Sequence, residues 1–350
     1  MVIHFLLSIF FLFFLVCFHE FFHFIFAKRA KIEVEEFGFG YPPRILKRKI
    51  FGTNFSFNLL PFGGFLKISE EELKRAQPLK KAKVIFGGIL SFWILSFFLF
   101  FFLNLIGFPT PFDEKQKNFV PLGVQVLSVV ENSPAKNSGI EIGDLIKGVK
   151  TENNFYLIFE VDDFKKLIES ERGKTVEIFI QRGKNQISKK IQIPTNPLFS
   201  KSYLGVGIEK MVLKKNSFFE SFFSTFKDLF SFAFFLIQKY LSFFYFIFTQ
   251  KEISKETVGP FGFLYFSQKI INLGINYILL FLAQVSISLA VFNSFPIPPL
   301  DGGKLLFVFF EYLDKELARK VEEKISLVVG VFLLVLIFIV SFRDLKRFIW

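Results

Sequence analysis

The sequence is poor in cysteine and histidine, and each shortage narrows what the protein can be. A single cysteine, Cys17, among 350 residues excludes an intrachain disulfide, so cysteine usage does not indicate the compartment. The N-terminus lacks both a basic n-region and an A-x-A-like cleavage site, so we expect no removable signal peptide. Three histidines are present, and two of them, His19 and His23, stand four residues apart. Such a pair in so histidine-poor a chain is a candidate site.

Hydrophobic residues are abundant instead. They make up 52% of the chain, which contains 58 phenylalanines and has a positive mean hydropathy. Soluble globular proteins are less apolar than this, and several segments are long enough to cross a bilayer. The net charge of +12 could indicate nucleic-acid binding, but the basic residues cluster beside apolar segments, where membrane orientation explains them better. We therefore expect the lipid bilayer, and no nucleic acid, as a partner.

The two histidines belong to a His19-Glu20-x-x-His23 motif inside an apolar run from Val2 to Ala27. On a helix, residues four apart lie on the same side, so the two imidazoles converge on one point. That geometry supplies the first two ligands of a zinc ion, with Glu20 beside them to act on water. Ionisable groups in hydrocarbon cost about 2.5–3.5 kcal/mol each and are usually functional. The motif therefore predicts one catalytic zinc ion.

A catalytic zinc ion takes three protein ligands and leaves a fourth position open. The remaining histidine, His4, lies about four turns away on the same predicted helix, too far to share the ion. A carboxylate is therefore needed. Asp301 is the candidate, because it follows a run from Asn293 in which three prolines interrupt a helix at membrane depth. Irregular backbone is tolerated there only where it is buried in protein or lines a cavity.

Four apolar segments predict transmembrane helices. The first, residues 2–27, would be about 39 Å long, enough to cross a hydrocarbon core of about 30 Å. The loop that follows carries 13 Lys or Arg through residue 83, so we expect it on the cytoplasmic side, with the motif near that face. Charged residues interrupt the apolar stretch 217–250, which we interpret as an interfacial helix. A fifth span there would carry Asp301 to the opposite side from the two histidines.

The cytoplasmic loop contains strand signals. Residues 54–59 alternate with period two, residues 61–65 form a turn with strand-like flanks, and residues 45–51 could pair with the first of these as a β-hairpin. This hairpin is either an ordinary surface element or an apolar edge that dips into the membrane beside the site and receives extended substrate. The pattern does not choose between the two interpretations.

Charged residues return between residues 112 and 194, where short β-rich runs alternate with turns. The succession is a loop entering a strand at 120–126, Ser-Pro-Ala at 133–135, Gly-Asp-Leu-Ile at 143–146, a helix at 161–170 and a hairpin around 182–185. It resembles a PDZ domain of the bacterial protease-associated kind. PDZ domains bind peptide ends or segments by adding a strand to a sheet edge. This one either binds such peptides, with Leu122, Gly123 and Val124 as the expected loop, or only restricts access sterically.

The two metal motifs and the inserted domain, in this order, resemble the site-2 protease family of intramembrane metalloproteases, most closely the bacterial type that cleaves an anti-sigma factor. The resemblance implies zinc bound by His19, His23 and Asp301, with Glu20 as the general base. It implies single-span transmembrane proteins as substrates, with the enzyme in the inner membrane, its PDZ domain outside and its active site near the cytoplasm. The substrate site is expected to include Asn293, Pro296, Pro298, Phe57, Gly63 and Gly64.

The chain departs from the family pattern at three points. The second span reads Gly87-Gly88-Ile89-Leu90-Ser91 where the family often has G-P-x-x-N. One PDZ domain is visible where the anti-sigma-factor type has two. Lys304 stands where a histidine commonly follows the L-D-G-G run. These departures bear on the substrate and on regulation more than on the chemistry.

We thus predict a polytopic α-helical membrane protein with about four transmembrane helices, a membrane-associated β-hairpin and one inserted α+β PDZ domain. Two other functions remain compatible with this architecture: a catalytically inactive adaptor that uses its PDZ domain alone, and a metal-binding transporter. A transporter would require more polar residues along several spans. The expected segments are 1–27 (first span), 28–83 (cytoplasmic loop with the hairpin), 84–107 (second span), 112–195 (PDZ domain), 196–275 (interfacial amphipathic helices), 276–303 (third span), 304–324 (cytoplasmic amphipathic helix), 325–342 (fourth span) and 343–350 (tail).

Overall fold

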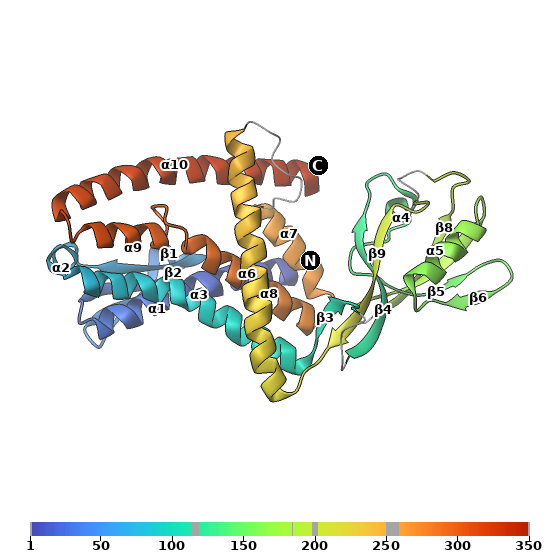
Figure 1. The fold of residues 1–350 in the computed structure, drawn as a ribbon, viewed down its shortest axis with the longest axis horizontal. Helices are drawn as coiled ribbons and strands as arrows, with labels where there is room; N and C mark the ends of the chain where they lie inside the picture. The colour runs from blue at the N-terminus through green and yellow to red at the C-terminus, as the bar shows by residue number, and fades with distance from the viewer. Residues whose placement is uncertain (1, 114–118, 184, 198–201, 250–258, 349–350) are drawn as a thin grey trace. The chain divides into compact units, whose positions relative to one another are not determined.

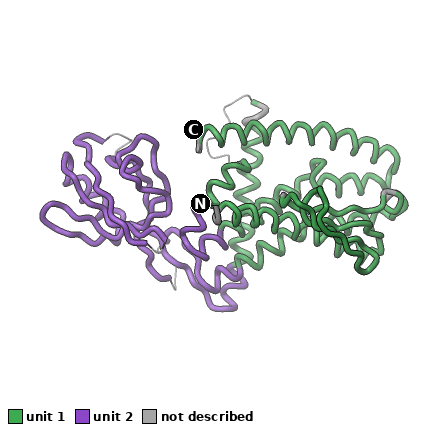
Figure 2. Tube along the Cα trace, turned by 180° about the vertical axis from the view of Figure 1, so that it is seen from behind, with its two compact units in different colours: residues 1–100, 225–268, 281–350 green, residues 101–224, 269–280 purple. Residues whose placement is uncertain are grey.

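Figure 1 shows the computed structural model of the chain, which describes residues 2–113, 119–183, 185–197, 202–249 and 259–348. The chain forms two units, coloured separately in Figure 2. The helical unit comprises residues 1–100, 225–268 and 281–350, and the β-rich unit comprises residues 101–224 and 269–280. The helices outside the sheet are α1 (Val2–Arg29), α2 (Glu70–Arg75), α3 (Pro78–Ile106), α6 (Phe218–Phe248), α7 (Pro260–Ile271), α8 (Ile275–Asn293), α9 (Asp301–Phe310) and α10 (Lys315–Phe348).

Four of the described helices, α1, α3, α8 and α10, are long and apolar enough to cross a membrane. The shortest of them, α8, has 19 residues and is therefore about 29 Å long, close to the thickness of a hydrocarbon core. All four overlap predicted spans, but α8 ends at Asn293, before the predicted end of the third span at residue 303. Helix α6 is 31 residues long but is not among them, and its placement at the interface stays a prediction.

The C-terminal third is divided differently from the expected segments. Helix α9 takes residues 301–310, and one continuous helix, α10, then covers residues 315–348. No proline interrupts α10, so its charged first turns, its apolar middle and the start of the predicted tail join into one helix. Residues 250–258, part of the predicted interfacial segment, lie outside the described residues, as do residues 349–350.

Two long antiparallel strands, β1 (Val34–Ile50) and β2 (Thr53–Ile68), connect α1 to α2. Lys47 pairs with Ser56, as expected for a hairpin of residues 45–51 with residues 54–59. The first half of β1 adds something that the pattern did not indicate: Phe37 pairs with Phe55 on one side and with Leu66 on the other. Residues 36–39 therefore lie between the two halves of β2.

Glycines let β2 approach the helix that carries the His-Glu-x-x-His motif. A Cβ atom on Gly63 would lie 2.9 Å from Cγ1 of Val16, and one on Gly64 would lie 3.3 Å from Sγ of Cys17. Gly63 also has a φ of 128°, which other residues rarely adopt. Further along α1, the ring of Phe24 packs edge-on against Phe55 at 5.5 Å. The sheet is thus attached along the second half of α1.

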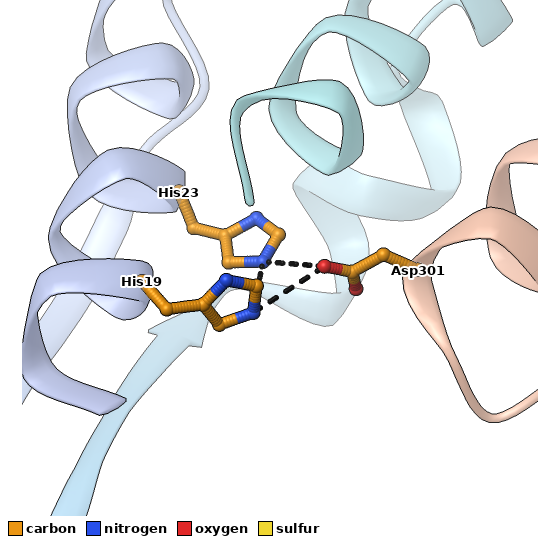
Figure 3. Close-up of side chains that lie close together, drawn as sticks. All are labelled: His19, His23 and Asp301. Atoms are coloured by element: carbon orange, nitrogen blue, oxygen red, sulfur yellow. Dashed lines mark hydrogen bonds and ion pairs between the residues drawn. The ribbon is translucent and has the colours of Figure 1, made fainter. Parts of the chain in front are cut away.

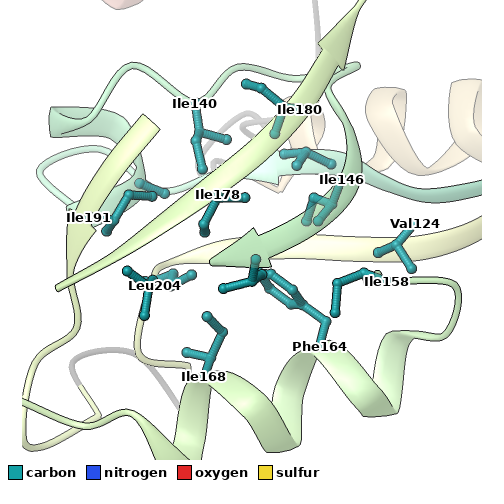
Figure 4. Packing of buried hydrophobic residues seen from close by; sticks show 14 of the residues in the cluster. Val124, Ile140, Ile146, Ile158, Phe164, Ile168, Ile178, Ile180, Ile191 and Leu204 are labelled. Atoms are coloured by element: carbon teal, nitrogen blue, oxygen red, sulfur yellow. The ribbon is translucent and has the colours of Figure 1, made fainter. Parts of the chain in front are cut away.

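The β-rich unit is built on a single sheet with the strand order β3-β9-β4-β5-β7-β8, to which β6 is added beside β5. Alternate residues of β7 (Val176, Ile178 and Ile180) are buried in one core cluster with Phe164 and Ile168 of α5. This is the alternation expected of a half-buried strand. Figure 4 shows part of this cluster. The elements are β3 (Phe108–Pro111), β4 (Phe119–Val129), α4 (Pro134–Asn137), β5 (Leu145–Lys150), β6 (Phe155–Leu157), α5 (Val161–Ser170), β7 (Thr175–Arg182), β8 (Asn185–Gln192) and β9 (Val206–Lys214).

The aspartate of the Gly-Asp-Leu-Ile run, Asp144, forms a buried ion pair with Arg182. Arg182 holds the buried carboxylate of Asp144 with two hydrogen bonds, Nε to Oδ1 at 2.7 Å and Nη2 to Oδ2 at 2.8 Å. These bonds raise the pKa of the Arg182 guanidinium above its ordinary value. Asp144 Oδ2 also accepts from the backbone N–H of Glu141 at 2.9 Å, which fixes the turn before β5.

Candidate metal centre

Three side chains from distant parts of the sequence meet within the helical unit. His19 and His23 lie one turn apart on α1, and their Nε2 atoms are 3.3 Å apart. Asp301, the first residue of α9, places Oδ2 at 3.3 Å from Nε2 of His19 and at 3.2 Å from Nε2 of His23 (Figure 3). Each of the three offers one ligand atom to a common point, as the sequence predicts.

The cluster fits a tetrahedral zinc site. Ligand atoms about 2.0–2.1 Å from a tetrahedral ion are about 3.3–3.4 Å from one another, which matches all three spacings. In addition, Oδ2 of Asp301 is buried without a hydrogen-bond donor. A buried carboxylate oxygen normally has a partner, and a cation is the partner that this oxygen lacks. Three protein ligands leave the fourth position free, as a catalytic site requires.

Helix α3 orients both imidazoles through contacts to their Nδ1 atoms. Nδ1 of His23 lies 2.9 Å from the carbonyl oxygen of Val84, and Nδ1 of His19 lies 3.1 Å from that of Gly88 and 3.2 Å from Oγ of Ser91. A carbonyl oxygen can only accept, so each Nδ1 carries the proton and each Nε2 keeps its lone pair for a metal. The ring of Phe92 stacks on His19 at 4.7 Å and limits its rotation.

Two glycines after Asp301 fix where its helix begins. A Cβ atom on Gly302 would lie 2.4 Å from the carbonyl oxygen of Ser294, and one on Gly303 would lie 2.1 Å from the backbone nitrogen of Pro298. The irregular segment 294–300 therefore folds back onto the first turn of α9, and only glycine leaves room for it. Packing thus requires both glycines of the L-D-G-G run, and the same packing fixes the orientation of the Asp301 carboxylate.

Two charged residues flank the cluster. Glu20 is half-buried on α1 and lies close enough to His19, His23 and Asp301 to interact with them electrostatically. Lys304, which departs from the family pattern, places Nζ at 3.7 Å from Oδ1 of Asp301, the oxygen that faces away from the imidazoles. Lys304 therefore interacts with Oδ1, while Oδ2 is left facing the two imidazoles.

The other predicted substrate residues are spread over the hairpin and the irregular segment. Asn293 donates its side-chain amide to the carbonyl of Leu289 in its own helix, at 3.0 Å. Pro298 is buried and Pro296 is exposed. Phe57 is half exposed and stacks on Phe39 at 4.8 Å. The roles of these residues, and of Gly63 and Gly64, stay predictions.

The predicted PDZ loop requires a correction. Strand addition needs an unpaired edge, but β4 pairs on both sides: Val124 is opposite Lys210 of β9 and Ile146 of β5. Val124 therefore cannot receive a strand, whereas the roles of Leu122 and Gly123 stay predictions. The free edge among the described strands closest to α5 belongs to β9, before residue 211, where pairing with β3 begins. The same Leu-Gly-Val triplet occurs there, at 204–206, so the triplet alone could not locate the edge.

A comparison with models of known protein families decides the family. The model for peptidase family M50 matches residues 7–337. The chain belongs to peptidase family M50. This is the family of the site-2 proteases, so the chain is a zinc metalloprotease with zinc as its cofactor. The apolar helices indicate a multi-pass membrane protein, and together with the family they indicate that this M50 peptidase is an intramembrane protease.

Relatives along nearly the whole chain agree with this assignment. A Clostridium perfringens protein named "Putative zinc metalloprotease" is 30% identical over 341 residues, covering 95% of both chains. A Campylobacter jejuni protein of the same description is 26% identical and covers 99% of this chain and 94% of its own. Among solved structures, the PDZ domain of an SdrC-like protein from Listeria monocytogenes is 26% identical and covers 25% of this chain and 86% of its own, with a TM-score of 0.21.

Proposed function

We propose that this M50 peptidase hydrolyses peptide bonds within the transmembrane segments of single-span membrane proteins, among them membrane-bound regulators such as an anti-sigma factor. The observation that carries the proposal is the cluster of His19, His23 and Asp301, whose ligand atoms lie within 4.8 Å of one another. Two of these ligands lie on α1, and the carbonyls that orient them lie on α3, both candidate membrane spans. Substrates that reach such a site are themselves in the membrane.

His19, His23 and Asp301 would hold the zinc ion, which would supply Lewis acidity to the scissile carbonyl and to the attacking water. Glu20 accepts the proton of the attacking water and delivers it to the leaving amine, because a carboxylate beside the ligands can hold a proton between the two steps. Val84 and Gly88 hold each imidazole in the tautomer that binds metal. Lys304 holds the outer oxygen of Asp301 and so keeps the inner one toward the site.

A peptide bond in a transmembrane helix is hydrogen-bonded and shielded, so the substrate must unwind locally before cleavage. Unwound backbone in the membrane needs new hydrogen-bond partners. The β1–β2 sheet would provide them by strand addition beside α1. Its attachment to α1 at Val16 and Cys17, one turn before His19, supports this role. In this scheme Phe57, Gly63 and Gly64 contact substrate, and Asn293, Pro296 and Pro298 shape the opposite wall.

The membrane placement follows from charge. The loop after α1 is strongly basic, so we place it in the cytoplasm of an inner-membrane enzyme, with the active site near that face. The β-rich unit then lies outside, where we propose that it is a PDZ domain that takes peptide segments or C-termini. The edge of β9 beside α5 is the place where such a peptide can add a strand.

The decisive experiment compares the wild-type enzyme with Glu20→Gln on a single-span membrane reporter. Glu20→Gln removes the proton acceptor but none of the three ligands, so we expect full zinc content and loss of cleavage. Comparative membrane proteomics of cells carrying either form should then show single-span proteins that accumulate with the variant. Full cleavage by Glu20→Gln would refute the general-base role. An enzyme that binds zinc but cleaves no membrane protein would point to the adaptor or transporter instead.

A further inference from the structure

A buried ion pair joins two helices of the metal centre at a distance from the ligands. Nζ of Lys81, on α3, lies 2.8 Å from Oε1 and 2.6 Å from Oε2 of Glu311, directly after α9. The two side chains are only 6% and 4% exposed, and the residues are 230 positions apart in the sequence. This pair is not part of the chemistry proposed above.

On both helices the ion pair and the metal centre lie a few turns apart: at the two ends of α9, and within the first half of α3. On α3, Val84, Gly88 and Ser91 follow Lys81 at spacings of three, four and three residues, which places them along one face. On α9, Asp301 and Glu311 are ten residues apart, about 15 Å along the helix. The ion pair and the metal centre are therefore the two ends of one contact between α3 and α9.

Stability is a poor explanation for this pair. Removing a lysine and a glutamate from water costs about as much as their attraction returns, so buried pairs contribute little net stability. Both charges also oppose the helix dipoles, since Lys81 is the fourth residue of α3 and Glu311 follows the last residue of α9. What a buried pair does provide is one fixed arrangement of the two helices, because any other leaves a charge unpaired in the interior.

We propose that the Lys81–Glu311 ion pair is a positioning element of the metal centre, which holds α9 against α3 so that Asp301 meets the two imidazoles. Helix α9 needs such a restraint because it is only ten residues long and follows the irregular segment 294–300. Its first turn is held by the fold-back of that segment, and its last turn is held by the ion pair. Loss of the pair lets α9 pivot and moves Oδ2 of Asp301 away from the histidines.

The test measures metal binding rather than proteolysis. Purified full-length protein is freed of metal and titrated with Co²⁺, whose visible absorption depends on the coordination geometry. We expect Lys81→Met and Glu311→Gln to lower Co²⁺ and Zn²⁺ affinity about 10–100-fold and to change the Co²⁺ spectrum, as loss of outer contacts does in other metal sites. Glu131→Gln is the matched control, since it breaks an exposed 2.8 Å pair with Lys136 in the β-rich unit and should change neither.

The charge-swapped variant Lys81→Glu/Glu311→Lys separates positioning from mere folding. The swap keeps the ion pair. It also places a negative charge in the first turn of α3 and a positive charge at the end of α9, the arrangement that the helix dipoles favour. We therefore expect it to restore the metal affinity and the Co²⁺ spectrum. Wild-type affinity and spectrum in both single variants would overturn the proposal. So would a swapped protein that folds, judged by its thermal unfolding, yet binds metal as poorly as the single variants.

The inference depends on the metal site of the proposed function but not on its substrate. Failure of the wild-type protein to bind Co²⁺ would refute the metal site itself. Normal binding by the wild type with no effect of the two substitutions would refute only the positioning role.

Discussion

Gly88 lies against the Nε2 atom of His23. A Cβ atom at this position would be 2.1 Å from that nitrogen and 2.6 Å from Oδ2 of Asp301, inside the space where the three ligand atoms meet. The same residue uses its carbonyl oxygen to hold His19. Helix α3 therefore contributes to the metal centre through its backbone and through the absence of a side chain.

Gly88→Ala should abolish metal binding without unfolding the protein. Alanine favours a helix over glycine by about 1 kcal/mol, so the helix itself loses nothing. Its methyl group, however, must push His23 or Asp301 out of place. Zinc content and the thermal unfolding of the metal-free protein would measure the two effects separately. Gly330→Ala on α10 is the control, because its Cβ would approach nothing closer than 3.9 Å. Wild-type zinc affinity in Gly88→Ala would contradict the geometry of this site.

The ligands themselves could be predicted from the sequence, because they follow from helix periodicity and from the need for a third ligand. The contacts around them could not. Val84 and Gly88 act through carbonyl oxygens, which every residue has, so no residue type marks them. The L-D-G-G run was visible, but its reason, the fold-back onto Gly302 and Gly303, depends on the backbone of a segment that has no regular structure.

Sheet topology was the weaker part of the prediction. Period-two alternation located a strand at residues 54–59 but not its register, and the double pairing of Phe37 involves residues far apart in sequence and has no local signal. The inserted domain shows the same limit. Its predicted end at residue 195 omits β9, which lies between β3 and β4 in the sheet. β9 begins at Val206, well after β8 ends at Gln192, and a strand so far along the chain is easily assigned to the next segment.

The carboxylate of Glu36 should make the β1–β2 sheet sensitive to acid. Burial alone would raise the pKa of Glu36. A hydrogen bond with Ser56 and two from Nη2 of Arg44, to Oε1 at 2.7 Å and to Oε2 at 2.9 Å, outweigh burial and lower the pKa below its ordinary value. Ionised Glu36 therefore stabilises the fold above about pH 4.5, and this stabilisation is lost as the pH falls through the lower pKa of the folded state.

Hydrogen exchange of the β1–β2 backbone amides would measure this effect. Exchange protection, corrected for the intrinsic rate, should fall in the wild type as the pH drops below about 4.5 and should depend less on pH in Glu36→Gln. Identical profiles in the two proteins would show that the Glu36–Arg44 pair does not contribute.

Asp344 caps helix α7 from the far end of the chain. Its Oδ2 accepts the backbone N–H groups of Gly259 at 2.8 Å and Gly262 at 2.9 Å, and the residue is 1% exposed. Asp344→Ala leaves one buried and one partly buried donor unsatisfied, so we expect a loss of about 2–4 kcal/mol in the free energy of unfolding. Asp344→Asn keeps one acceptor oxygen and should lose less. Denaturant titration of the purified protein would rank the three, and equal stability of Asp344→Ala and wild type would contradict the cap.

Removal of the β-rich sheet should separate substrate selection from metal binding, provided that the deletion respects the strand pairing. A deletion of residues 112–195 would leave β9 without β4, since the two strands pair from Phe119 with Lys214 to Val129 with Val206. Exposed strand edges of this kind aggregate. A deletion of residues 108–215 with a short flexible linker removes all seven strands together.

We expect the shorter deletion to aggregate and the longer one to keep zinc at full content, because the three ligands and the α3 carbonyls lie outside it. If the domain restricts access, the longer deletion should also cleave membrane substrates that the full chain rejects. Zinc analysis and cleavage of a panel of single-span reporters would test both points. Unchanged rejection of those reporters would remove the domain from substrate selection and leave the membrane part of the chain as the source of specificity.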